Sequence, residues 1–217
     1  KTLQIQFLKN LGFFDKIENL EIYEKGRPLH RSEKFWQDHT VATTAYGYGI
    51  SVTPIHIITA FSSILNGGIY TPPTLISEAT NRKSKRVIST QTSMDMRKLL
   101  RDVVIYGSGK NANIEGYEVA GKTGTANKLE NGRYVKGKNV TSFVSAFPIS
   151  DPKYALMVII DSPKGLPETF NFVTSGWNAC PTGGKIITRI APKLDIMPNF
   201  DLQTQRAKVL KSYGIKN

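Results

Sequence analysis

The spacing of apolar residues along the chain predicts four helices. Apolar side chains recur every three or four positions in four segments, residues 2–11, 54–65, 91–106 and 181–194. Pro54 fits the first position of the second helix, where its missing N–H is not needed, and Thr53 before it can cap the helix. Asn66-Gly67-Gly68 marks the end of this helix. Residues 13–45 are polar, and they show no regular pattern.

After Gly107-Ser108-Gly109 the pattern changes, and three strands are expected at residues 117–126, 140–148 and 154–161. Asn131-Gly132 indicates a turn within a polar loop between the first two. The connection at residues 150–153 is too short for a crossover helix, so the third strand should be antiparallel to the second. That third strand is apolar throughout its middle, which predicts burial on both faces and helices to cover them.

These elements predict an α+β fold, with an antiparallel sheet flanked by helices rather than alternating βαβ units. We expect residues 1–110 to be mainly helical and residues 112–195 to hold the strands and the last helix. The length of 217 residues suits one domain or two small ones, and 40% hydrophobic and 21% charged residues exclude collagen-like, coiled-coil and wholly disordered chains. The longest apolar run, Ala155–Ile160, is far shorter than a membrane-spanning helix.

The chain carries a surplus of positive charge. The 29 Lys and Arg residues exceed the 17 Asp and Glu residues by 12, which favours a nucleic acid, an anionic membrane surface or an acidic polymer as partner, or serves solubility alone. The densest basic cluster, Arg82–Arg86, has no nucleic-acid recognition motif near it. A single cysteine, Cys180, excludes an internal disulfide, and three widely spaced histidines argue against a metal centre.

One segment carries candidate chemistry. Gly116–Thr123 matches the phosphate-loop pattern G-x-x-x-x-G-K-[ST], but no helix is predicted after it, so we reject a nucleotide site. On a strand at a sheet edge, the same residues have another use. Thr123 and Thr125 point the same way and can bind a carboxylate together with Lys122, while Gly124 lets a substrate backbone lie alongside. An ordinary strand with an exposed lysine remains the alternative.

Val119–Ala126 resembles the Lys-Thr-Gly box of penicillin-binding proteins, the serine transpeptidases of peptidoglycan synthesis. Further segments resemble class B members in the same order: Tyr46–Pro54, Asn66–Pro72, Gly132–Tyr134 and Phe143–Pro148. The resemblance covers roughly residues 40–195, and the tail from Gly176-Trp177 to Pro192 is most similar to division-type enzymes. His56 stands where the family often has Gln.

The resemblance implies the fold shared by penicillin-binding proteins and serine β-lactamases, present here as a partial domain. It implies acylation of a serine by a D-Ala-D-Ala stem peptide or a β-lactam, followed by transfer to an amine. Lys122 and Thr125 would be catalytic, the latter through its backbone N–H in an oxyanion hole. The substrate-binding residues would be Lys122, Thr123, Gly124, Thr125 and Ala126. No cofactor, metal or nucleic acid is implied.

The family also needs Ser-x-x-Lys and Ser-x-Asn. Ser-x-Asn is absent from the chain, and the literal match Ser150–Lys153 holds Pro152 inside what should be a helical turn. We therefore expect residues 1–217 to be the C-terminal portion of the transpeptidase domain, inactive alone, of a protein with a membrane anchor, a periplasmic catalytic domain and a role beside the division or elongation machinery. An inactive scaffold or binding module, and a β-lactamase or β-lactam sensor, are the alternatives.

Other conspicuous side chains have simpler interpretations. We expect Cys180 and His56 to be packing residues rather than a reactive thiol and a catalytic base. Trp36 and Trp177 are expected to anchor the core, although Trp177 ends a loop that could border a cleft.

Overall fold

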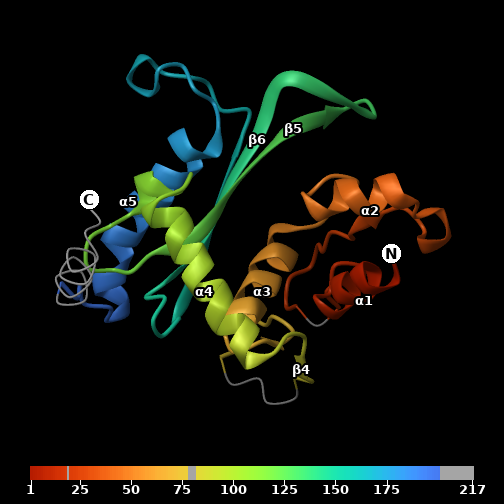
Figure 1. Ribbon diagram of the computed structural model, residues 1–217, viewed down its shortest axis with the longest axis horizontal. Helices are drawn as coiled ribbons and strands as arrows, with labels where there is room; N and C mark the ends of the chain where they lie inside the picture. Colours follow the sequence, from red (N-terminus) through yellow and green to blue (C-terminus); the bar gives the residue numbers. More distant parts are fainter. Residues whose placement is uncertain (19, 78–81, 201–217) are drawn as a thin grey trace, which may run out of the picture. The chain divides into compact units, whose positions relative to one another are not determined.

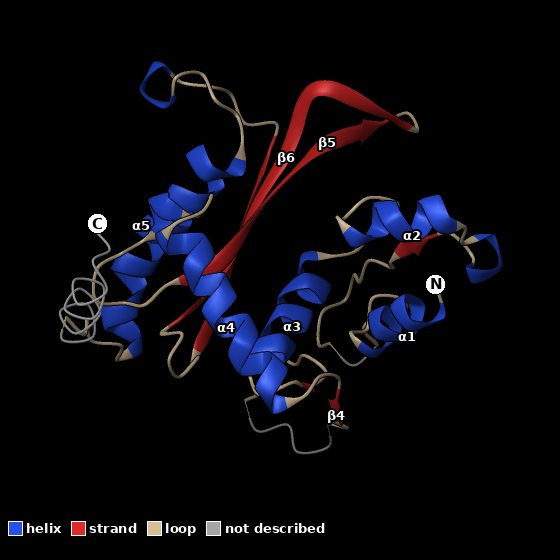
Figure 2. Cartoon of the chain, in the orientation of Figure 1, coloured by secondary structure: helices blue, strands red, loops and turns tan. Residues whose placement is uncertain are grey.

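The computed structural model describes residues 1–18, 20–77 and 82–200 of the chain. It divides into two compact units, residues 1–96 and residues 97–217. Figure 2 shows helices and short strands in the first unit and the long strands in the second. The expected α+β class is confirmed, because helices accompany sheets that are antiparallel throughout. Within the described residues, no helix is both long and apolar enough to cross a bilayer.

The described residues of the first unit form three complete α-helices and two small sheets. The helices are α1 Thr2–Asn10, α2 Asp38–Ala45 and α3 Pro54–Leu65. Strand β1 Leu29–His30 pairs with β2 Ile50–Ser51, and β3 Ile69–Tyr70 pairs with β4 Lys85–Arg86. The sequence prediction of α1 and α3 is confirmed, whereas α2 lies in the segment predicted to be irregular. Its sequence, DHTVATTA, has β-branched residues and little apolar periodicity, so tertiary contacts must decide its conformation.

Helix α3 begins at Pro54, as predicted, but Thr53 does not cap it through its side chain. The Thr53 hydroxyl lies 2.6 Å from Nδ1 of His56, one turn along. His56 is only 2% exposed, and its Nε2 lies 2.9 Å from the carbonyl oxygen of Asp15, to which it donates. Both ring nitrogens therefore have partners, which fits the expected packing role of His56.

Up to residue 200, the second unit is built on one three-stranded sheet (Figure 1). Its strands are β5 Ala120–Glu130, β6 Arg133–Phe147 and β7 Tyr154–Asp161, in that order and antiparallel. Helix α4 Thr90–Ile105 runs across the boundary between the two units along the chain, and α5 Ala179–Ile190 follows the last strand. Short 3₁₀ turns follow in the connections: η2 Lys110–Ala112, η3 Pro167–Thr169, η4 Ser175–Trp177 and η5 Ala191–Leu194. One more, η1 Glu33–Phe35, belongs to the first unit.

The first two strands differ from their predicted bounds. The predicted polar loop around Asn131-Gly132 is instead a long β-hairpin, in which only these two residues form the turn. Their φ values of 50° and 76° give the left-handed turn that matches the twist of paired strands. β5 also begins later than Tyr117, since Glu118 has a φ of 47° and interrupts an extended backbone.

The core of the second unit lies between β6 and α5. Alternate residues of β6, Thr141, Phe143, Ser145 and Phe147, are fully buried. Gly183 of α5 lies so close that a Cβ there would come within 2.8 Å of the Phe143 ring. Ile187, one turn further along α5, is also fully buried in this cluster. The helix therefore packs directly on one face of the sheet.

The bounds of β7 agree with the prediction, but its predicted burial on both faces is wrong. None of its eight residues is fully buried, and Ile159 is 41% exposed. Only Leu156, Val158 and Ile160 pack against the core beneath α5. Within the described residues β7 is an edge strand of the sheet, and its remaining apolar side chains are only partly buried or exposed.

Candidate functional site

Strand β5 carries the Lys-Thr-Gly box at an edge of the described sheet, with β6 as its partner. Side chains alternate along the strand, so Thr123 and Thr125 share one face and Lys122 and Gly124 share the other. The structure thus confirms that the two threonines point the same way. It does not bring Lys122 onto their face.

Thr123 and Thr125 line a cavity of about 440 Å³ in the second unit. The other lining residues come from the turn after α4 and from the loop before α5: Gly107, Ser108, Lys110, Asn111, Thr174, Gly176 and Trp177. Three segments far apart in sequence therefore meet at one site. Within the described part of the chain, the lining includes no carboxylate, and Lys110 contributes a positive charge.

Hydrogen bonds fix both threonine hydroxyls. Oγ1 of Thr123 lies 2.6 Å from Oγ of Ser108. Oγ1 of Thr125 accepts the backbone N–H of Ser175 at 3.0 Å, and Oγ of Ser175 donates to the Ser142 carbonyl at 2.6 Å. Because Thr125 accepts from a backbone N–H, its own hydroxyl hydrogen remains available to an acceptor in the cavity.

Lys122 projects from the opposite face of β5, where it is paired with Val144. Its Nζ donates to the Thr123 carbonyl at 2.9 Å, and the side chain is exposed. Gly124 is on the same face, where an added Cβ would come within 2.6 Å of Oγ of Ser142. The lack of a side chain at Gly124 thus lets β6 approach β5 closely, and it also leaves this position of β5 free of side-chain atoms. Ala126 pairs with Val140 and does not line the cavity.

A profile described as "Penicillin binding protein transpeptidase domain" matches residues 14–175. The chain belongs to this family. A probable peptidoglycan D,D-transpeptidase FtsI of Caulobacter vibrioides is 36% identical over 210 residues, covering 92% of this chain and 35% of that protein. Stage V sporulation protein D of Bacillus subtilis is 37% identical over 214 residues, covering 91% and 32%. The chain thus spans about a third of these relatives.

Solved structures agree with the transpeptidase fold. The transpeptidase domain of Burkholderia pseudomallei penicillin-binding protein 3 superposes with a TM-score of 0.78 at 28% identity, over 90% of this chain and 58% of that one. Penicillin-binding protein 3 of Mycobacterium tuberculosis, solved in complex with ampicillin, superposes with a TM-score of 0.81 at 22% identity, over 92% and 47%. The resemblance inferred from the box and its flanking segments is confirmed, as is the fold that it implied.

The structure also tests the two motif matches that the sequence analysis rejected, the phosphate-loop pattern and Ser150–Lys153. The phosphate-loop pattern ends on β5, which continues as strand to Glu130, so no helix follows Thr123. Ser150–Lys153 forms the turn between β6 and β7, where Lys153 pairs with Asp151 at 2.7 Å. Neither segment has the local structure that its motif requires, as the sequence analysis predicted.

Trp177 lines the cavity, so it has a place at the site and is more than a core anchor. Its ring stacks on Phe172 at 5.5 Å between centroids and meets Phe170 edge-on at 5.9 Å. Phe170 and Phe172 are 74% and 52% exposed. Trp36, by contrast, is 2% exposed and donates Nε1–H to the Arg31 carbonyl, as expected of a core residue.

Sequence reasoning missed Ser108, Lys110 and Asn111. The pattern of Gly107-Ser108-Gly109 predicts only the end of a helix, although the Ser108 hydroxyl contacts Thr123 of the box. Asn111 Nδ2 donates to the Gly176 carbonyl at 2.7 Å, which joins two walls of the cavity. The available signal for Ser108 in the sequence was its position between two glycines, in the connection that leads to the strand of the box.

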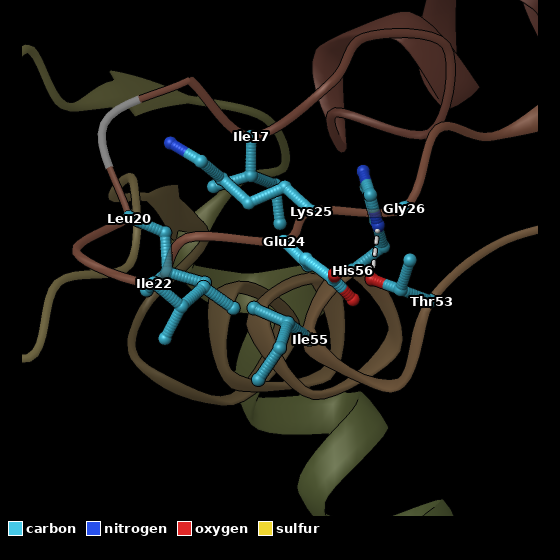
Figure 3. A pocket seen from close by; sticks show the side chains of 9 residues that line it. All are labelled: Ile17, Leu20, Ile22, Glu24, Lys25, Gly26, Thr53, Ile55 and His56. Carbon is cyan, nitrogen blue, oxygen red and sulfur yellow. Dashed lines mark hydrogen bonds between the residues drawn. The ribbon is translucent and has the colours of Figure 1, made fainter.

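Cys180 and His56 both have the surroundings of packing residues. Burial raises the pKa of the Cys180 thiol to about 11, and the side chain is fully buried. His56 borders a separate pocket in the first unit, where Ile17, Leu20 and Ile55 supply an apolar lining (Figure 3). The figure shows the hydrogen bond between His56 and Thr53. The other ring nitrogen of His56 donates to the Asp15 carbonyl oxygen. Its burial and these two contacts within the first unit fit the packing role expected of it.

Proposed function

We propose that this chain is the C-terminal part of a peptidoglycan D,D-transpeptidase that cross-links stem peptides through an acyl-serine intermediate and binds penicillin. The observation that carries the proposal is the pair of hydroxyls on Thr123 and Thr125 at a sheet edge, beside a cavity with a lysine and no carboxylate in its described lining. A D-Ala-D-Ala peptide ends in a carboxylate, and a penicillin carries an equivalent group. Both suit hydroxyl donors placed in this way.

Each residue of the box has a proposed role. Thr123 and Thr125 hold the ligand carboxylate, and the Thr125 backbone N–H stabilises the oxyanion of the tetrahedral intermediate. Gly124 and Ala126 let the ligand backbone lie along the edge of β5. Lys122, exposed on the same edge strand, organises the hydroxyl and proton network of the nucleophile and attracts the carboxylate.

We propose that the part of the protein outside this chain supplies the nucleophile. The serine hydroxyl attacks the D-Ala-D-Ala peptide carbonyl, and the terminal D-Ala leaves as the amine. A second amine, from a neighbouring stem peptide, then displaces the serine. The relatives are about three times as long as the matched region, which leaves room for the Ser-x-x-Lys and Ser-x-Asn motifs.

The proposed setting is the bacterial inner membrane, with an anchor outside this chain and the catalytic domain on the periplasmic side. The segment from Gly176 to Pro192 resembles division-type enzymes, which supports a role with the cell-division machinery. A role with the elongation machinery is the alternative. The proposed partners are stem peptides and β-lactams, with no nucleic acid. An anionic cell-wall precursor is a sufficient partner for the charge of +12.

The test is covalent labelling of the full-length protein with a fluorescent penicillin, followed by intact-mass analysis. We expect a stable acyl adduct on the full-length protein and none on residues 1–217 alone. Lys122→Ala should slow acylation greatly, whereas Lys136→Ala, an exposed lysine of the hairpin, should not. Rapid release of hydrolysed penicillin would favour a β-lactamase, no adduct would favour a scaffold, and unchanged labelling of Lys122→Ala would reject its role.

A further inference from the structure

We infer that Ser108 and Lys110 form a second wall of the carboxylate subsite, and that Lys110 supplies a further positive charge, besides that of Lys122, which attracts the substrate's terminal carboxylate. The inference rests on the proposed transpeptidase function. It concerns residues outside the Lys-Thr-Gly box, on the turn between α4 and β5.

The position of this turn is fixed by contacts on both sides of the cavity. Oγ of Ser108 lies 2.6 Å from Oγ1 of Thr123, which joins the turn to β5. Asn111 Nδ2 donates to the Gly176 carbonyl, which joins it to η4. Gly176 packs so closely that a Cβ there would lie 3.0 Å from the Ser108 carbonyl oxygen. Lys110 therefore stands on a wall whose backbone is held in place.

The charges around the cavity point to Lys110. A carboxylate that leaves water for a cavity needs hydrogen bonds and an opposite charge. Lys122 projects from the other face of β5, donates to the Thr123 carbonyl, and is not among the residues that line the cavity. Lys110 lines the cavity itself, and none of the other described lining residues is charged.

The hydroxyls around the cavity can serve two oxygen atoms at once. In the Ser108–Thr123 pair, one hydroxyl donates to the other, and the second hydrogen remains for a ligand. Thr125 accepts the Ser175 N–H and so offers a further hydrogen. Two donors on one side of a cavity, with a lysine on its wall, match the two oxygens and single charge of a carboxylate.

The test uses the full-length protein and two compounds, benzylpenicillin and its methyl ester, which lacks the carboxylate charge. The measured quantity is the ratio of their second-order acylation rate constants. We expect a ratio in favour of benzylpenicillin that falls by about tenfold in Lys110→Ala and stays high in Lys110→Arg, because a charged hydrogen bond is lost only in the first. The preference should also weaken with added salt in the unsubstituted protein and less so in Lys110→Ala, since the lysine is exposed.

Ser108→Ala should lower the same ratio, whereas the distant Lys136→Ala should leave it unchanged. Both compounds report on the same folded fraction, so partial unfolding of a variant does not alter the ratio. An unchanged ratio in Lys110→Ala, or a loss in Lys110→Arg as large as in Lys110→Ala, would overturn the inference. If neither compound acylates the unsubstituted protein, the proposed function itself fails, which is a different result.

Discussion

Replacing Thr125 with valine should weaken both the fold and the site, for separate reasons. Valine has nearly the same shape as threonine but lacks the hydroxyl that accepts the Ser175 N–H at 3.0 Å. Ser175 is only 1% exposed, so its N–H would be left buried without this acceptor. An unsatisfied buried donor costs about 1–3 kcal/mol of the free energy of unfolding. Thr125→Ser keeps the hydroxyl and should lose much less.

The second effect of Thr125→Val concerns the ligand. A hydrogen bond to a charged group is worth about 1.5–3 kcal/mol, so losing the Thr125 donor should slow acylation by a penicillin roughly 10- to 100-fold. The two effects are measured separately, by urea unfolding of the full-length protein and by the rate of adduct formation under conditions where the variant is folded. Equal unfolding free energies for the valine, serine and unsubstituted proteins would refute the reasoning about Ser175.

Three further predictions follow from contacts in the second unit. Gly183→Val should lower the free energy of unfolding by about 1–3 kcal/mol, because its side chain would overlap the Phe143 ring beneath α5, and urea unfolding measures this loss. Lys128→Met should raise the pKa of the Asp161 carboxyl, which the hydrogen bond from Lys128 now lowers; a carboxyl titration by NMR follows it. Because the pKa of Asp161 is lower in the folded protein than in the unfolded chain, the Lys128–Asp161 pair stabilises the fold above the pKa of the unfolded carboxyl. This stabilisation is lost as the pH falls through the lower pKa of the folded protein. Cys180 should resist a thiol reagent at pH 8 until urea unfolds the protein, because its pKa of about 11 keeps the buried thiol protonated; rapid labelling of the folded protein would contradict this.

Much of the second unit could be predicted from local signals. The bounds of β7 agree because Ser150–Lys153 is a short turn before an unbroken apolar run. Asn131-Gly132 marked the hairpin turn, since both residues tolerate a positive φ. The long outer part of the hairpin was missed because its strands are polar on both sides. Such strands have no buried face, so apolar alternation cannot reveal them.

What the sequence could not show depends on contacts between distant segments. The burial of β7 was overestimated because an apolar run does not reveal how many layers cover it. α2 was missed because its threonines have weak intrinsic preference for a helix. Ser108 joins the site only because the end of α4 reaches β5, at a sequence distance of fifteen residues. The opposite placement of Lys122 and Thr123, by contrast, follows from the period of a strand and was available from the sequence.

The alternation along β5 has a consequence for how this protein can change. Lys122 and the two threonines are neighbours in sequence, yet their side chains meet different surroundings on opposite faces of one strand. Under the roles proposed above, a substitution at Ser108 or Lys110 would alter which acids the site binds and would leave the opposite face of β5, which carries Lys122, unchanged. Under the same proposal, selection for a different ligand preference can act at positions outside the Lys-Thr-Gly box.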